Sequence, residues 1–69
     1  MTITMEKKVN GLWLIVETES AIYHIKVGYD ESVGWFAECE DGALLCTKTL
    51  KSFWKHRRAI AKRIIEDFM

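Results

Sequence analysis

Several features are absent from this chain of 69 residues, and their absence excludes two classes of protein. There is no proline, no repeat and no low-complexity stretch, which excludes a repeat or biased-composition architecture. No apolar run approaches the roughly 18–20 residues that a membrane-spanning helix needs. We therefore expect no membrane segment.

Cysteine and histidine are also rare, with two of each. No N-terminal segment combines a basic start, a long apolar run and a small-residue cleavage site, so we expect a cytoplasmic, reducing compartment. Cys39 and Cys46 should then be half-buried free thiols. Together with His24 and His56 they show no C-x-x-C or H-x-x-x-H spacing, which argues against zinc. We expect no metal and no cofactor.

Catalytic patterns are equally weak. Either cysteine with a histidine would make a nucleophile and base, but nothing in their spacing favours such a pair. Glu38, Glu40 and Asp41 admit two interpretations, a metal-binding acid cluster or a solvated strand end followed by a turn, and the second fits the pattern better. We therefore expect no catalytic residues and no enzyme activity.

What is present is enough apolar material for one folded domain over residues 1–69. Apolar residues make up 49% and aromatic residues 12% of the chain, unlike a disordered protein. A core this small supplies only about 3–5 kcal/mol, so small folds commonly add disulfides, a metal or a second subunit. With the first two disfavoured, a homodimer is the remaining means of stabilisation.

The first two-thirds of the chain predicts an antiparallel sheet of four to five strands. Asn10-Gly11 suits a two-residue hairpin turn within residues 2–18, and would pair Val9 with Leu12 and Met5 with Val16. Further β-type segments follow over residues 21–47. Apolar residues at every position of 12–16 indicate a strand that is buried on both faces.

From about residue 50 to residue 68 the apolar period becomes helical, so we predict an α+β fold with one C-terminal helix packed on one face of the sheet. Thr49 suits the N-cap. Arg57 falls on the apolar stripe, where it should reach the edge or meet an acid. The opposite face is basic, with Lys51, Lys55, Arg58, Lys62 and, beside them, Arg63.

Charge and apolar surface both suggest contact surfaces. Residues 1–46 hold three Lys and eight acids, a net charge of −5, whereas residues 47–69 hold seven Lys/Arg and two acids, a net charge of +5. One helix covers one face, which leaves Trp13, Ile15 and Phe36 as an apolar face for a dimer or partner. A homodimer would pair these faces or the sheet edges. The basic helix face is a solvated surface, a nucleic-acid contact or a site for an acidic protein.

From Tyr23 onward the chain has a strand, an acidic turn, a Gly-aromatic strand, a second turn and the Thr-Leu start of a helix, in the order Ile25-Lys26-Val27, Tyr29-Asp30-Glu31-Ser32, Gly34-Trp35-Phe36-Ala37-Glu38, Asp41-Gly42 and Thr49-Leu50. In this order of motifs the stretch resembles the HicB-like antitoxin domain family, including its small stand-alone members of unknown function. It implies a truncated ribonuclease-H-like sheet with a helix, without nuclease activity.

This chain departs from the family pattern in several places. Leu45 and Lys48 stand where members often have Thr and Asp, the helix is basic where the family's is acidic, and the N-terminal hairpin is additional. The chain stops at Met69, before the DNA-binding segment of such antitoxins, so promoter binding is not implied. We expect a non-catalytic, antitoxin-like protein-interaction module that binds a small toxin ribonuclease. The alternative is a small nucleic-acid-binding protein that uses the basic helix face.

Overall fold

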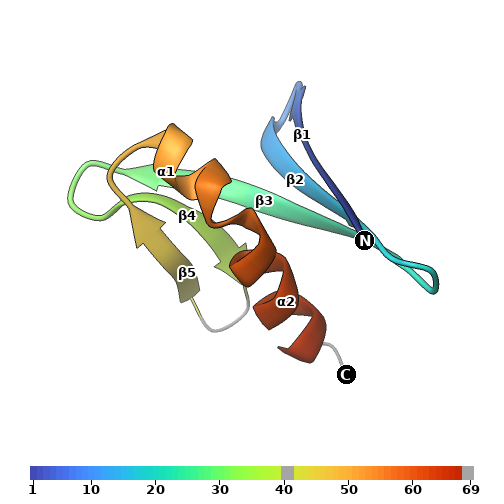
Figure 1. Ribbon diagram of the computed structural model, residues 1–69. Helices are drawn as coiled ribbons and strands as arrows, with labels where there is room; N and C mark the ends of the chain where they lie inside the picture. Colours follow the sequence, from blue (N-terminus) through green and yellow to red (C-terminus); the bar gives the residue numbers. More distant parts are fainter. Residues whose placement is uncertain (40–41, 68–69) are drawn as a thin grey trace.

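A computed structural model describes residues 1–39 and 42–67, with only the backbone described at residues 39 and 42–45. The chain forms an antiparallel sheet followed by a helical layer (Figure 1). The predicted α+β fold is confirmed. The elements are β1 (Thr2–Lys8), β2 (Gly11–Glu17), β3 (Ile22–Asp30), β4 (Gly34–Cys39), β5 (Gly42–Thr47), α1 (Leu50–Lys55) and α2 (Arg57–Asp67).

The strands lie in the sheet in chain order, from β1 to β5. The first hairpin turns at Val9-Asn10, and Lys8 pairs with Gly11. The predicted register is therefore wrong by two residues: Met5 pairs with Leu14 and not with Val16. The predicted register would have set Lys7 opposite Leu14, which is fully buried. The observed one sets an apolar side chain there and leaves Val9 in solvent.

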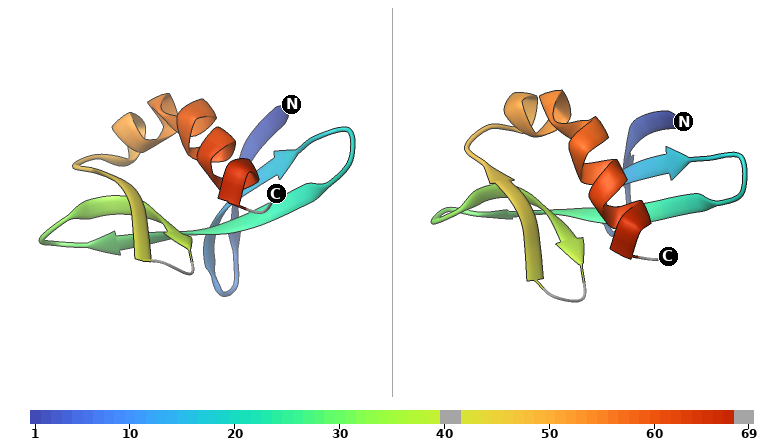
Figure 2. Two further views of the ribbon diagram at one scale, coloured as in Figure 1. Left: turned by 90° about the horizontal axis from the view of Figure 1, so that it is seen from below. Right: turned by 60° about the horizontal axis from the view of Figure 1, so that its bottom comes forward.

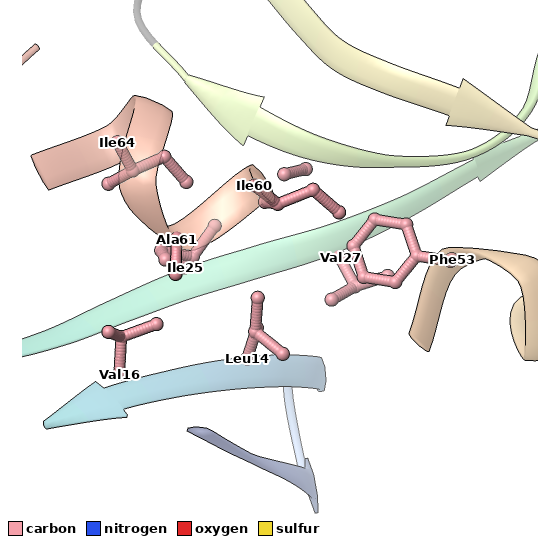
Figure 3. Packing of buried hydrophobic residues seen from close by; sticks show 9 residues of the cluster. Leu14, Val16, Ile25, Val27, Phe53, Ile60, Ala61 and Ile64 are labelled. Carbon is pink, nitrogen blue, oxygen red and sulfur yellow. The ribbon is translucent and has the colours of Figure 1, made fainter. Parts of the chain in front are cut away.

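The core occupies one face of this sheet. In neighbouring strands Leu14 pairs with Ile25, and Val27 pairs with Ala37, so side chains of one parity converge beneath the helices (Figure 3). The buried apolar residues come from β2, β3, β4 and both helices: Leu14, Val16, Ile25, Val27, Ala37, Phe53, Ile60, Ala61 and Ile64. The helical apolar period predicted over about residues 50–68 is confirmed by the buried Phe53, Ile60, Ala61 and Ile64, and residue 68 lies outside the described residues.

The helical layer is bent. Thr49 caps α1 as predicted, because its hydroxyl accepts from the Ser52 N–H at 3.0 Å. The prediction of one continuous helix is wrong at His56, where α1 ends with φ −96° and ψ 12°. There the Ser52 carbonyl receives the His56 N–H at 3.2 Å and has the ring Nδ1 within 2.8 Å. A side chain that enters the helical ladder is a known cause of kinks, and α2 leaves in a new direction (Figure 2).

Arg57 is accommodated at this bend by two contacts with Trp54. Its Nη1 donates to the Trp54 carbonyl at 2.9 Å, and its guanidinium carbon lies 4.4 Å from the centre of the Trp54 ring. The contact satisfies the charge beside the core with a carbonyl and an aromatic face. Of the two expectations for Arg57, half-burial agrees with a position at the edge, and no ion pair with an acid is found among the described residues.

The last strand, β5, approaches the backbone of Gly34 closely. Gly34 has φ +88°, and a Cβ there would collide with the carbonyl oxygen of Thr47, the residue that pairs with Trp35. Cys46 precedes Thr47 and is exposed, so the expected half-burial of this thiol is wrong. Successive side chains of a strand alternate between faces, and Thr47 lies opposite a residue that packs on the core. The side chain of Cys39 lies outside the described residues.

Candidate functional site

The face of the sheet opposite the helices, called here the open face, carries the apolar side chains expected from the sequence. Trp13 and Ile15 on β2 and Phe36 on β4 are each half-buried, and Ile22 on β3 is 59% exposed. Strand pairing keeps them on one face, because Trp13 pairs with Lys26 and Phe36 pairs with Gly28, two residues further along β3. Both described helices lie on the other side of the sheet (Figure 2). The expectation that the 12–16 strand is buried on both faces is therefore wrong.

Lysine side chains shield Trp13. The ammonium groups of Lys8 and Lys26 each lie 5.8 Å from the centre of its ring. The stem of Lys26 passes over Gly11, where a Cβ would meet its Cε at 3.2 Å. The indole Nε1 donates to Asn10 Oδ1 at 3.0 Å. Trp13 is thus held in one orientation by cation–π contacts and a hydrogen bond, with part of its ring left accessible.

Phe36 lies against the sheet because its partner in β3 is a glycine. A Cβ on Gly28 would stand 2.6 Å from two atoms of the Phe36 ring and 3.0 Å from Glu38 Oε1. The missing side chain therefore makes room for an aromatic ring and a carboxylate side by side. Cross-strand aromatic cover of a glycine is a recognised way to compensate for its lack of packing.

Carboxylates share the open face with these apolar side chains. Alternation along the strands places four exposed acids on the open face, against two lysines: Glu6, Glu17, Asp30 and Glu38. Lys8 lies 3.9 Å from Glu6 in an exposed pair, which leaves the other acids without a described ion pair. Hydrogen bonds from the side chain and backbone of Ser32 hold the pKa of Asp30 below its ordinary value. The described part of the open face therefore has a formal charge of −2.

The basic residues predicted on the helix all reach solvent. Lys51 and Lys55 are on α1, and Arg58, Lys62 and Arg63 are on α2 beyond the bend at His56. Within residues 42–67 and 1–39, the single ion pair among these five is Arg63 with Asp67, at 3.6 Å between Nε and Oδ1. The bend divides the basic surface between two helices, which the sequence pattern had joined into one row.

The other candidate groups are dispersed. His24 is exposed on the open face, with its Nδ1 3.4 Å from the Lys8 ammonium, while His56 is engaged at the helix bend. Glu38 belongs to the open face, and Glu40 and Asp41 lie outside the described residues. Over the described side chains, no three His, Cys, Asp or Glu groups gather where they can hold a metal ion.

The acids of the open face are the residues that the sequence reasoning missed. It grouped acids by their nearness in the chain, as at residues 38–41, or by net charge over residues 1–46. Glu6, Glu17, Asp30 and Glu38 come from four strands and share a face only once the pairing register is known. The available signal was alternation, since Trp13 and Glu17 have the same parity within β2.

In the portion of the chain that is described, no helix is long and apolar enough to cross a membrane. No protein-family model matches the chain, and comparisons with curated proteins and with solved structures found no match either.

Proposed function

We propose that this chain is a non-catalytic, HicB-like interaction module of the cytoplasm, a homodimer whose open face binds a basic protein, such as a small toxin ribonuclease. One observation carries the proposal. Half-exposed apolar side chains, Trp13, Ile15 and Phe36, share one uncovered sheet face with four carboxylates. A protein-binding surface has this composition, with an aromatic and aliphatic centre and a polar rim.

The charge of the rim favours a particular kind of partner. A ribonuclease binds phosphates through Lys and Arg, so the surface that competes with its substrate must present carboxylates beside apolar contact area. The open face offers both, and Trp13 is already held in place by Lys8, Lys26 and Asn10. Such prior ordering reduces the entropy lost on binding.

The test reverses charge at the rim. In E17K/E38K two open-face acids change sign, and in the matched control E19K/E66K two exposed acids elsewhere change sign. Tagged chains are used to capture proteins from the native host, and each captured basic protein is purified and titrated by calorimetry. We expect the original chain and the control to bind one basic protein and E17K/E38K to lose at least about tenfold in affinity. Equal affinity of all three chains, or capture of no basic protein, would overturn the proposal.

The basic helix face supports a second candidate, single-stranded nucleic acid. Arg57 and Trp54, whose half-buried side chains stack, are the chain neighbours of the exposed Arg58 and Lys55, and cations beside an aromatic ring are what such proteins use for phosphates and bases. We expect any binding to weaken steeply with salt and to be abolished in K55E/R58E/K62E, while K55R/R58K/K62R retains it. Absence of retardation of a single-stranded RNA and a duplex DNA at low salt would remove this candidate.

A further inference from the structure

β1 is an edge strand, and its outer side has no partner among the strands that the structure describes. The direction of its backbone groups follows from the pairing. Thr18 N–H donates to Ala21 O at 2.8 Å where β2 turns into β3. Along a strand the direction of the backbone N–H and C=O groups alternates, so Val16, Leu14 and Leu12 also bond toward β3. The residues between them therefore bond toward β1.

The same alternation assigns the groups of β1. Thr2, Thr4 and Glu6 pair with Glu17, Ile15 and Trp13, and direct their backbone groups toward β2. The N–H and C=O groups of Ile3, Met5 and Lys7 must therefore point outward from the sheet edge. A row of free donors and acceptors of this kind is a template for another strand.

The open face itself does not suit a second copy. Two such faces in a symmetric contact would bring two sets of the same four carboxylates together, and each described face carries a net negative charge. The β1 edge has no such conflict, because it combines two apolar side chains with threonines and charges of both signs: Ile3, Met5, Thr2, Thr4, Glu6 and Lys7.

We propose that a second copy of this chain pairs antiparallel with β1, with Thr4 at the two-fold axis. This register places Ile3 opposite the second copy's Met5 on the helix-covered side and Thr4 opposite Thr4 on the open side. Ile3 and Met5 are half-buried and pack on the core, so each gains an apolar neighbour. The hydrogen-bonded pairs of this ladder are the Ile3–Met5 pairs, whose backbone groups point outward.

Neighbouring registers are worse. An axis at Ile3 shortens the paired segment from residues 1–7 to residues 1–5. An axis at Met5 sets Ile3 opposite Lys7. An axis at Glu6 or at Lys7 sets two equal charges directly opposite each other, which is destabilising. The Thr4 axis sets no like-charged side chains opposite each other, because Thr2 faces Glu6 and Lys7 faces Met1, and it sets Ile3 opposite Met5. It joins the two sheets into one, with all helices on one side and both open faces on the other, so that each copy keeps a free open face.

This inference rests on the homodimer of the proposed function and is tested apart from partner binding. In a C39S/C46S background, a single cysteine is placed at position 4 or position 6 (T4C or E6C). Both positions are exposed and bond toward β2. In the proposed register the two Cα atoms of position 4 form a non-hydrogen-bonded pair about 4.5 Å apart, within disulfide range. The two position-6 atoms are displaced by four residues, about 13 Å, and cannot join.

We expect mild oxidation to convert T4C into a cross-linked dimer and to leave E6C unlinked. The original chain should sediment at twice its 8.1 kDa mass at high concentration. Amide exchange supplies a readout without substitution: Ile3 and Met5 should exchange at least about tenfold more slowly in the dimer than at dilution, while Thr4, bonded to β2 in either state, changes little.

Cross-linking of E6C as fast as T4C, a mass of 8.1 kDa at all concentrations, or unchanged exchange at Ile3 and Met5 would each overturn the proposed edge contact. None of these outcomes bears on the rim acids, because E17K/E38K tests the open face in a monomer as well as in a dimer. Conversely, a T4C cross-link together with unaltered partner binding by E17K/E38K would support the edge contact and reject the proposed partner site.

Discussion

The two faces of the sheet are formed by the same strands but are covered in different ways. Leu14 and Trp13 are adjacent in β2, yet Leu14 is fully buried and the larger Trp13 is half-buried. On one face α1 and α2 supply Phe53, Ile60 and Ile64, and the side chains interlock (Figure 3). On the other face the aromatic rings are covered by lysine stems and by the sheet itself.

The two faces therefore contribute differently to folding stability and to binding. Removal of apolar area from water contributes about 25 cal/mol per Å², so the helix-covered face must supply most of the folding free energy. The open face leaves part of its apolar area in water, and this area is what a partner can still bury. The contrast between the faces is therefore measurable as two different responses to substitution.

The largest effect is expected from Phe53→Ala, at the centre of the covered face. Phe53 is fully buried in contact with the core. Truncation of a buried Phe to Ala costs about 3–5 kcal/mol, which is comparable to the whole stability of a domain this small. Urea unfolding followed by circular dichroism should show a largely unfolded variant. A loss below about 1 kcal/mol would mean that the covered face is not the main source of stability.

The same contrast explains how far the sequence could be read. Hydrophobic period sufficed for the covered side, since it predicted the strands and the helical segment whose Phe53 and Ile60 are buried, and residue type predicted the Thr49 cap. The predicted hairpin register was wrong by two residues. The local preferences of Asn10-Gly11 allow a turn centred on these two residues as well as one centred a residue earlier, on Val9-Asn10. Burial of Leu14 opposite Met5 decides between them, and this is a tertiary contact.

The open face was predicted only in part, for a related reason. Trp13, Ile15 and Phe36 followed from alternation along single strands, but their acidic neighbours depend on register between strands. The bend at His56 was beyond helix propensity altogether. At the bend, the Nδ1 of the His56 ring lies within hydrogen-bond distance of a carbonyl of the preceding turn, and the Arg57 guanidinium donates to another. Such competition between side chains and backbone leaves no periodic signal.

A smaller effect is expected from Trp13→Ala, on the open face. The ring is half-buried and has two ammonium groups near it, so its removal should cost about 1–2 kcal/mol. Trp13→Phe is the matched variant, because it keeps an apolar ring but loses the indole hydrogen bond to Asn10. Its urea midpoint should fall between those of the other two chains. A cost equal to that of Phe53→Ala would remove the contrast between the faces.

A still smaller effect on stability is expected from substitution of Gly28, and its sign should depend on whether Phe36 is present. Alanine in place of glycine gains about 0.5–1 kcal/mol from the backbone alone, but its Cβ displaces the Phe36 ring. Gly28→Ala should therefore stabilise the Phe36→Ala variant and fail to stabilise the original chain. A double-mutant cycle by urea unfolding measures this coupling. Equal effects of Gly28→Ala in the two backgrounds would show that Phe36 does not lie against the glycine.

The smallest effect concerns Asp30, at the rim of the open face, where Ser32 donates to its carboxylate from Oγ at 2.5 Å and from N–H at 2.8 Å. These bonds lower the pKa of Asp30 in the folded state, the side-chain bond first. A lowered folded-state pKa makes a stability contribution that is complete above the unfolded-state pKa and disappears as pH falls through the folded-state pKa. An NMR titration of the carboxyl carbon should show a higher Asp30 pKa in Ser32→Ala, still below the ordinary value because the backbone bond remains. An identical pKa in both chains would mean that the Ser32 hydroxyl does not lower the pKa of Asp30.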